Sequence, residues 1–366
     1  RINRLVVRQT AAGLADVLLG RPRAPETGPV LVGFDARHLS EVFAHDVAEV
    51  LCAAGLDVTL TPGPRPTPFV AWTMRQIGAV AAVVVTASHN PAADSGLKIY
   101  DTDGAQIVPP LDAAIRRSIV AHAHHDPPGS PDGPTILEDG WDDRYVDFAA
   151  GAGPSPDPHT PLRVAFTALH GVGADFLRRS LTLAGVSEIV DVAEQSSPDP
   201  DFPTVAFPNP EEPGATDLLL DLAERSHADL ALALDPDADR LAMGCRDDGT
   251  WKVLSGDQLG ALFCEGLLRV RPDRSPPALV VSTVVSSRLA GRIATARGAR
   301  FVETLTGFKW LCRPGLADAS VEVVLAYEEA LGYAVDGLLD KDGISAAVAM
   351  TSLHRRWRSE GRHPLG

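Results

Sequence analysis

The chain has 366 residues, of which 45% are apolar and 22% are charged, and its formal net charge is −15. This length predicts roughly two or three domains with a large buried core. The negative charge argues against a nucleic-acid partner, whose phosphates it would repel, although a local cluster of cations in a cleft could still bind a small anion.

Two further features bear on where the protein resides. The longest apolar stretch, residues 77–87, is too short to cross a bilayer, and no basic-then-apolar leader precedes it. The four cysteines lack any C-x-x-C spacing, which is typical of reduced thiols in the cytosol. We therefore expect a cytoplasmic protein with no membrane partner. Because the chain begins at Arg1 rather than Met, we interpret it as a fragment, truncated at both ends.

Three segments of the chain repeat the same order of elements: an apolar strand, a loop of small and polar residues, and an amphipathic helix. The strands begin at Val30, Leu162 and Ala278. The helices are predicted over residues 41–54, 174–184 and 288–297. A glycine just past each helix supplies the usual left-handed stop; these glycines are Gly55, Gly185 and Gly298.

Each segment continues with a second strand, another helix and a third strand. The second strands are predicted at residues 57–60, 188–192 and 299–304, and the third at 80–85, 230–234 and 321–325. This alternation predicts α/β units with mixed, largely parallel sheets. Pro- and Gly-rich linkers at 151–161 and 271–277 divide the chain into three similar α/β/α domains. The expected domains are residues 1–158, 159–272 and 273–366.

The third strand of each segment runs directly into a polar loop. Because open α/β sheets bind ligands beyond the carboxyl ends of their strands, we expect the three loops to surround one shared cleft. The first loop, Thr-Ala-Ser-His-Asn-Pro at 86–91, carries Ser88 and His89. A serine hydroxyl needs a base or a metal to become a nucleophile. An Asx-turn with a satisfied imidazole fits the same residues, and the lack of a Gly-x-Ser-x-Gly elbow disfavours a hydrolase triad.

The second loop, Asp-Pro-Asp-Ala-Asp-Arg at 235–240, places carboxylates at alternate positions. Hard oxygen ligands at this density suit Mg²⁺, and three crowded carboxylates without a cation would raise one another's pKa values. The predicted metal ligands are Asp235, Asp237 and Asp239. The alternative is a solvated acidic turn. Arg240 could hold a substrate oxygen or pair with one of these aspartates.

The third loop, Tyr-Glu-Glu-Ala-Leu-Gly-Tyr at 327–333, carries paired acids. Glu328 could hydrogen-bond vicinal sugar hydroxyls, or cap a helix among surface acids. Residues 304–309 and 340–343 are further candidates for contacts with an anion or a sugar, although each alone would be an ordinary turn.

With these loops in order, the chain resembles the α-D-phosphohexomutase superfamily, which includes phosphoglucomutases and phosphomannomutases. The resemblance covers essentially the whole chain. It implies that Ser88 is the phosphorylated serine and a metal ligand, and that the aspartate loop with Arg240 holds Mg²⁺. It also assigns phosphate or proton handling to two lysines, and substrate binding to the sugar-selecting loop and a Thr-Gly-x-Lys segment. These residues are Lys98, Lys341, Glu328, Thr306, Gly307 and Lys309.

The resemblance further implies a reaction that interconverts a sugar 1-phosphate and a sugar 6-phosphate, of glucose or mannose, through a phosphoserine and a sugar bisphosphate. His89 and Lys98 both remain candidates for the proton acceptor. Arg37 either screens the serine phosphate or pairs with Asp35, and His170 is interpreted as a helix-entry residue.

The sequence also departs from the pattern of this superfamily. The superfamily has an N-terminal Gly-Thr-x-Gly-x-Arg-Gly loop and a fourth, phosphate-clamping domain, and neither has a counterpart in this sequence. In the sugar-selecting loop, Ala330 replaces the serine that is typical of classical phosphoglucomutases and phosphomannomutases. Residues 305–310 and 328–333 are closer to a subgroup of phosphopentomutases and a second type of bacterial phosphoglucomutase. A phosphopentomutase and a non-catalytic sugar-phosphate binder therefore remain alternatives, and no oligomeric state is predicted.

Overall fold

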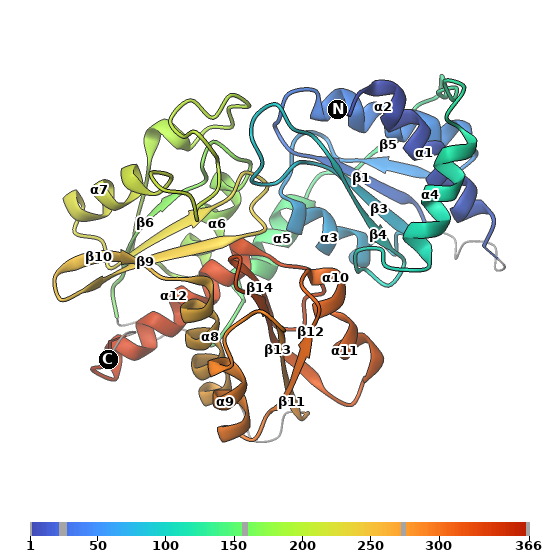
Figure 1. Cartoon of the computed structure of the whole chain (residues 1–366). Coiled ribbons are helices and arrows are strands. Elements are labelled where there is room, and N and C mark those ends of the chain that lie inside the picture. Colours follow the sequence, from blue (N-terminus) through green and yellow to red (C-terminus); the bar gives the residue numbers. More distant parts are fainter. Residues whose placement is uncertain (1, 22–27, 156–159, 272–275, 364–366) are drawn as a thin grey trace.

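The computed structural model describes residues 2–21, 28–155, 160–271 and 276–363. Three lobes, each built on its own sheet, meet at the centre of the molecule (Figure 1). The expected domain boundaries, between residues 158 and 159 and between 272 and 273, lie outside the described residues and stay a prediction.

The first lobe has a five-stranded sheet in the order β4-β3-β1-β2-β5. Its strands are β1 (Val30–Phe34), β2 (Val58–Leu60), β3 (Ala81–Val85), β4 (Leu97–Asp101) and β5 (Thr135–Ile136). All pairs are parallel except β3 with β4. Helices cover both faces, so β1 and β3 are buried throughout and contain only apolar residues and glycine. The helices are α1 (Arg4–Leu19), α2 (Ser40–Ala53), α3 (Thr67–Gln76), α4 (Leu111–Ala121) and α5 (Trp141–Ala150).

The second lobe repeats this arrangement with the order β10-β9-β8-β6-β7. Its strands are β6 (Arg163–Thr167), β7 (Glu188–Asp191), β8 (Leu230–Leu234), β9 (Leu241–Asp247) and β10 (Thr250–Val253). Strands β6, β7 and β8 are parallel, whereas β9 runs antiparallel to β8. Its helices are α6 (Ala174–Leu183), the 3₁₀ turn η1 (Ala193–Gln195) and α7 (Asp217–Arg225).

The third lobe has a four-stranded sheet in the order β12-β11-β13-β14. Its strands are β11 (Ala278–Thr283), β12 (Arg300–Thr304), β13 (Glu322–Glu328) and β14 (Gly332–Val335). Its helices are α8 (Gly256–Val270), α9 (Leu289–Ala296), α10 (Phe308–Leu311), α11 (Arg313–Ala317) and α12 (Gly343–Ser359). Helix α8 packs on β13, and α12 crosses to contact β8 and β9 of the second lobe (Figure 1).

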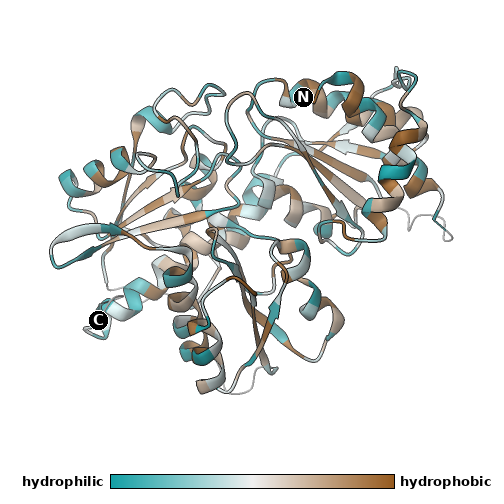
Figure 2. Cartoon of the chain, in the orientation of Figure 1, coloured by the Kyte–Doolittle hydropathy of each residue, from teal (hydrophilic) through white to brown (hydrophobic). Residues whose placement is uncertain are grey.

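The three sheets confirm the predicted fold class, since each has the same spatial order of its first, second and third parallel strands. Each predicted stop glycine has a left-handed φ, between 75° and 90°. Hydropathy follows this architecture, because apolar residues lie in the strands and the helix faces between layers (Figure 2). One strand is longer than expected: β13 extends to Glu328, because its last residues pair with the antiparallel β14.

Candidate functional site

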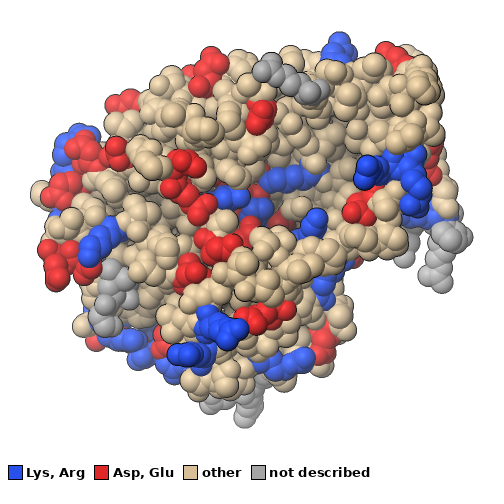
Figure 3. Space-filling model, in the orientation of Figure 1, with Lys and Arg blue, Asp and Glu red and all other residues tan. Residues whose placement is uncertain are grey.

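The three polar loops connect β3 to β4, β8 to β9 and β13 to β14, and they approach one another at the centre of the molecule. The surface is hollowed where the three lobes meet, with Lys and Arg side chains in the hollow and acidic side chains along its border (Figure 3). The expected shared cleft therefore exists, and it contains Lys and Arg side chains although the chain is acidic.

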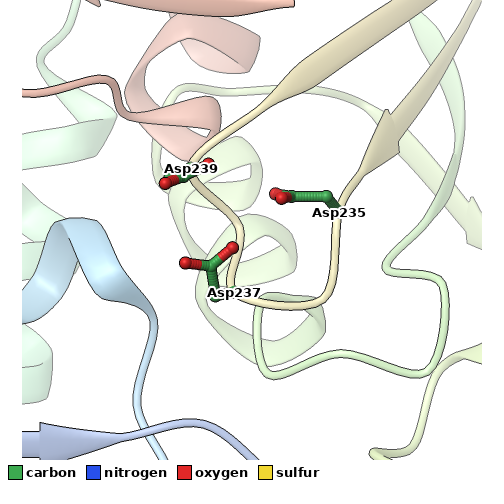
Figure 4. Close-up of side chains that lie close together, drawn as sticks. All are labelled: Asp235, Asp237 and Asp239. Atoms are coloured by element: carbon green, nitrogen blue, oxygen red, sulfur yellow. The ribbon is translucent and has the colours of Figure 1, made fainter. Parts of the chain in front are cut away.

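The aspartates of the second loop converge on one point. Asp235, Asp237 and Asp239 are fully buried, and each offers a carboxylate oxygen within 4.8 Å of the others. Figure 4 shows the three carboxylates turned toward the same space from one loop. Ala238 has a left-handed φ of 60°, which curls the backbone so that alternate side chains reach one side.

Ser88 of the first lobe contacts this group directly. Its Oγ donates a hydrogen bond of 2.8 Å to Oδ2 of Asp235, and lies 3.3 Å from Nδ1 of His89. The backbone of Ser88 is left-handed, with φ 52°, and its N–H donates to Oγ1 of Thr86 at 2.8 Å. The structure thus brings the predicted phosphorylated serine to the predicted metal ligands.

Two lysines compensate the buried carboxylates. Nζ of Lys98, on β4, lies 2.6 Å from Oδ2 of Asp237 and 2.5 Å from Oδ2 of Asp239. Nζ of Lys341, which follows β14, lies 2.9 Å from the same oxygen of Asp239. Each lobe therefore contributes charge to the centre: lysines from the first and third, and carboxylates from the second.

Asp235 and Asp237 have pKa shifts in opposite directions. Burial, together with the charges of Asp237 and Asp239, raises the pKa of Asp235 well above its usual value. Burial would also raise the pKa of Asp237, but the charge and hydrogen bond of Lys98 outweigh it and hold that pKa below its usual value. Burial would lower the pKa of Lys98, yet the two carboxylates raise it well above normal. Lys98 is therefore a protonated ammonium here.

The other candidate proton acceptor has the opposite charge state. Burial, followed by the positive charge of Arg240, lowers the pKa of His89 to about 4. Near neutral pH the His89 imidazole is therefore uncharged and has a free lone pair. Of the two candidates, only His89 is in the form that can accept a proton in this state.

Arg240 connects the aspartate loop to the third lobe. Its backbone N–H donates to Oδ1 of Asp235 at 3.0 Å, and its backbone forms a β-bridge with Gly332. Its guanidinium lies 3.2 Å from Oε2 of Glu211 rather than on an aspartate of its own loop. The sequence left open whether Arg240 holds a substrate oxygen or pairs with an aspartate of its loop. Within the described residues its guanidinium pairs with Glu211 and not with one of those aspartates.

Glu328 is the last residue of β13 and is 6% exposed. Burial raises the pKa of its carboxyl group, and the positive charge of Lys341 opposes that shift. A side chain on Gly332 would collide with both Glu328 and Lys341, so the glycine allows these two groups to approach. Glu328 therefore ends a strand and does not cap a helix.

The Thr-Gly-x-Lys segment lies farther from the aspartates. Thr306 is exposed, and Gly307 adopts a φ of 106° before the short helix α10. Within the described residues, no hydrogen bond joins the side chains of Thr306 or Lys309 to the aspartate cluster. The link is indirect, because Nζ of Lys341 lies 5.7 Å from the ring centre of Phe308.

Three polar residues of the site were not predicted: Thr67, Glu211 and Tyr100. Oγ1 of Thr67, at the start of α3, donates to Oδ2 of Asp237 at 2.5 Å, and Glu211 orients Arg240. Tyr100 donates to Asp340 at 2.6 Å, next to Lys341. Thr67 had a usable signal, since it begins the helix that follows the parallel strand β2. The other two depend on contacts between distant segments.

The donor set fits a hard divalent cation. Oδ1 of Asp237 and Oδ1 of Asp239 are buried and accept no hydrogen bond within the described residues. Buried carboxylate oxygens without a donor are costly, so they indicate a further positive ligand. All donors are oxygens, the chemistry that Mg²⁺ prefers.

Comparisons with known proteins agree with this architecture. Three family profiles match in order: phosphoglucomutase/phosphomannomutase alpha/beta/alpha domain I at residues 1–126, domain II at 143–249 and domain III at 255–361. A probable phosphomannomutase of Haemophilus influenzae is 38% identical over 370 residues, covering 99% of this chain and 73% of the relative. Human phosphopentomutase is 35% identical over 396 residues, covering 96% of this chain and 62% of the relative.

Solved structures are similar in fold. A phosphoglucomutase/phosphomannomutase family protein of Burkholderia thailandensis superimposes with a TM-score of 0.80 at 23% identity, covering 97% of this chain and 74% of that one. An N-acetylphosphoglucosamine mutase variant of Aspergillus fumigatus, in complex with glucose 1,6-bisphosphate, gives a TM-score of 0.53 at 15% identity over 98% of this chain and 82% of that one.

The three-lobed fold, with a serine loop facing an aspartate loop, defines an α-D-phosphohexomutase, a protein of the phosphosugar mutase class. The chain belongs to the phosphoglucomutase/phosphomannomutase family, and it matches that family in domains I to III. Within the described part of the chain, no helix is both long and apolar enough to span a membrane.

Proposed function

We propose that this chain carries the phosphoryl-transfer centre of a phosphosugar mutase, in which Ser88 accepts and returns the phosphoryl group. The observation that carries the proposal is the hydrogen bond of 2.8 Å between Oγ of Ser88 and Oδ2 of Asp235. It places a potential nucleophile from one lobe on a buried carboxylate cluster of another.

In this mechanism phospho-Ser88 gives its phosphoryl group to the free hydroxyl of a sugar monophosphate. The serine oxygen–phosphorus bond breaks as the new sugar oxygen–phosphorus bond forms, and the serine oxygen is left as the leaving group. The sugar bisphosphate then turns over in the cleft and returns its other phosphoryl group to the Ser88 oxygen. His89, uncharged near neutral pH, accepts the proton of the attacking hydroxyl and passes it to the released Ser88 oxygen, which lies 3.3 Å from its Nδ1.

Asp235, Asp237 and Asp239 would hold Mg²⁺ together with an oxygen at Ser88. When bound, Mg²⁺ supplies positive charge that stabilises the phosphoryl oxygens during transfer. Lys98 and Lys341 neutralise the carboxylates from the side and face the same space. Arg240, Glu328 and the Thr306–Lys309 segment bind and orient the sugar phosphate in this proposal.

We infer sugar 1-phosphates and 6-phosphates of glucose or mannose as the substrates, with a sugar bisphosphate as intermediate and activator. The Haemophilus relative, described as a probable phosphomannomutase, supports this reading, as does the glucose 1,6-bisphosphate bound to the Aspergillus enzyme. Such substrates are small cytoplasmic metabolites, which fits a cytoplasmic location and no nucleic-acid or membrane partner.

A pentose substrate is the second candidate. The human phosphopentomutase and a probable phosphoribomutase of Schizosaccharomyces pombe are 35% and 36% identical to this chain. Ala330 lies in the turn after Glu328, so a hydroxyl that would contact a hexose is missing there. Comparing kcat/KM for ribose 1-phosphate and glucose 1-phosphate decides between the two.

The test of the proposal is Ser88→Ala. Full-length protein is incubated with glucose 1-phosphate, Mg²⁺ and a trace of glucose 1,6-bisphosphate, and formation of the 6-phosphate is followed. We expect the variant to lose at least about ten-thousand-fold in kcat, because the group that carries the phosphoryl is gone. Ser118→Ala, which removes an exposed hydroxyl bonded to Asp16, is the matched control with normal turnover. Full activity in Ser88→Ala would exclude covalent transfer at this serine.

A further inference from the structure

Arg37 is a buried cation whose guanidinium contacts the backbone of the serine loop. It is 4% exposed and lies in the loop after β1. Its guanidinium donates to the carbonyl oxygens of Ser88 at 2.6 Å, Asn90 at 2.5 Å and Pro91 at 2.8 Å. One planar side chain therefore gathers three carbonyls of the loop that carries the serine hydroxyl.

The carboxylate of Asp35 is only a secondary partner of this guanidinium. Its Oδ2 lies 3.4 Å from Nε of Arg37, and that Nε makes no hydrogen bond within the described residues. Asp35 instead accepts hydrogen bonds from Ser40 and Thr86, both at 2.6 Å. The sequence analysis considered a phosphate screen and an ion pair with Asp35 as roles of Arg37. Neither includes the hydrogen bonds to the carbonyls of the serine loop, which are its main contacts.

The serine loop needs such support because of its backbone. Ser88 has φ 52°, a left-handed conformation that a residue with a Cβ adopts at a cost. A strained conformation persists only where surrounding contacts hold it. The three hydrogen bonds from Arg37 to the carbonyls of the loop provide that hold.

The second lobe holds Arg37 in turn. The ring centre of Phe202 lies 4.9 Å from the guanidinium carbon, within the range of a cation–π contact. Phe202 is 4% exposed. Nearby, Nε2 of His38 lies 2.7 Å from Oδ1 of Asp201, so the two lobes also touch beside the ring.

The segment that carries Phe202 is braced by the loop after β6. Asp199 N–H donates to the carbonyl of His170 at 3.0 Å, and Nε2 of His170 lies 2.8 Å from Oγ1 of Thr204. Gln195 donates to the same hydroxyl at 2.8 Å. His170 thus holds residues 199–204, a role beyond helix entry.

We propose that Arg37 and Phe202 form a clasp, through which the second lobe positions the serine loop so that Oγ of Ser88 lies on Asp235. The proposal rests on the proposed function of Ser88. Neither residue touches the reacting oxygen, so both are positioning residues. The clasp links the serine loop of the first lobe to the second lobe, which also carries the metal ligands. It therefore fixes the position of the Ser88 hydroxyl relative to those ligands.

Kinetics of four variants test the clasp. Arg37→Lys keeps the charge but loses the planar fork, and we expect kcat to fall about a hundredfold, as expected for a misplaced reacting group. Phe202→Leu keeps apolar bulk but loses the ring, and we expect about a tenfold fall in kcat. In both, KM should change little, because the sugar-binding residues are untouched. Phe202→Tyr retains the aromatic ring, so its kcat should equal that of the wild type.

Phe166→Leu is the matched control. Phe166 lies in β6 of the same lobe and also has an arginine, Arg178, 5.3 Å from its ring centre, but that arginine pairs with Asp191 of its own lobe. It should lose stability without losing kcat. If Phe166→Leu and Phe202→Leu lower kcat equally, the clasp is wrong.

A second readout follows the loop itself. The ³¹P resonance of phospho-Ser88 should move or broaden in Arg37→Lys and Phe202→Leu, and stay in place in Phe166→Leu. Suppose that the wild type is active and that both clasp variants have its kcat and its ³¹P spectrum. This result would contradict the clasp and leave the proposed function of Ser88 intact. Wild-type protein that gains no phosphate on Ser88 would instead contradict the proposed function and the clasp built on it.

Discussion

Single residues at the centre of this protein offset the negative charge of the chain. The sequence has a net charge of −15, yet Lys98 and Lys341 pair with the buried aspartates. Such buried charges are stable only when they are paired. An anionic substrate therefore meets cations in the cleft even though the overall field is unfavourable.

The role of Lys98 leads to a prediction about metal removal. In Lys98→Met, the carboxylates of Asp237 and Asp239 lose their shared ammonium, and we expect the metal-free protein to lose about 3 kcal/mol of unfolding free energy. Mg²⁺ can replace that charge. Thermal unfolding with EDTA and with Mg²⁺ should therefore show a larger metal-dependent rise in Tm for the variant than for the wild type.

Lys252→Met is the control, because Lys252 pairs with Asp247 on the surface and is remote from the cleft. Its response to Mg²⁺ should equal that of the wild type. If Lys98→Met and the wild type gain the same Tm from Mg²⁺, the aspartates do not hold the metal in the way proposed.

At the scale of elements, most parallel strands could be predicted, whereas the parallel β5 and the antiparallel strands could not. Strands β1, β3, β6, β8 and β11 are short apolar runs followed by polar loops, a pattern visible in the sequence. Strands β4, β9 and β14 were missed. In β4 and β14, residues such as Lys98 and Gly332 gave no continuous apolar signal, whereas β9 begins with an apolar run at residues 241–245 that was overlooked.

The site was predictable where its residues are adjacent in the sequence. The aspartate loop and Ser88 could be found because each motif lies in one loop at the end of a buried strand. The contact of Arg37 with Phe202 could not, because it depends on how two lobes pack, and the contact of Arg240 with Glu211 could not, because it joins two segments of the second lobe that are far apart in the sequence. Local spacing carries no information about such pairs.

Helix α12 is the element that ties the site to the second lobe. Asp342 caps its first turn and accepts hydrogen bonds from Ile344 and Ser345, one residue after Lys341. The helix then crosses to β8 and β9 and is buried along most of its length. The segment after α5 also packs closely on this helix, since a Cβ on Gly153 would lie 2.8 Å from Cα of Ala349.

His354 makes the docking of α12 sensitive to acid. Burial, and then the charge of Arg358, lowers the pKa of His354 to about 3 in the folded protein, against 6.5 in the unfolded chain. The unfolded state therefore binds the proton first. Stability from this residue is present above pH 6.5 and is lost as the pH falls toward 3, by about 1.4 kcal/mol per pH unit.

His354→Leu should remove this dependence. Urea unfolding between pH 7 and pH 5 should give a shallower loss of free energy for the variant than for the wild type, by about 2 kcal/mol at pH 5. The exposed His45, changed to Leu, serves as the control and should leave the slope as it is. Equal slopes for His354→Leu and the wild type would mean that this imidazole is not buried uncharged.

At the scale of the whole molecule, the first and third lobes meet through a polar contact. Tyr100 and Gln106, on the hairpin edge of the first lobe, both donate to Oδ2 of Asp340, at 2.6 and 2.8 Å. Arg313 of the third lobe reaches back to Asp103 at 2.6 Å. Because Asp340 precedes Lys341, this contact sets how the third lobe presents a cation to the aspartates of the second.

Tyr100→Phe tests whether that contact joins the lobes. The variant keeps the buried ring and removes one donor to Asp340, so we expect a loss of about 1–2 kcal/mol of unfolding free energy. Because the lost bond lies between lobes, amide hydrogen exchange at residues 97–106 should become faster than in the wild type, while exchange in β8 stays slow. Tyr333→Phe is the matched change within one lobe, since its hydroxyl donates to the carbonyl of Gly256 at 3.2 Å. If both variants leave exchange at 97–106 unchanged, the first and third lobes are held by apolar packing, and Asp340 serves only to orient Lys341.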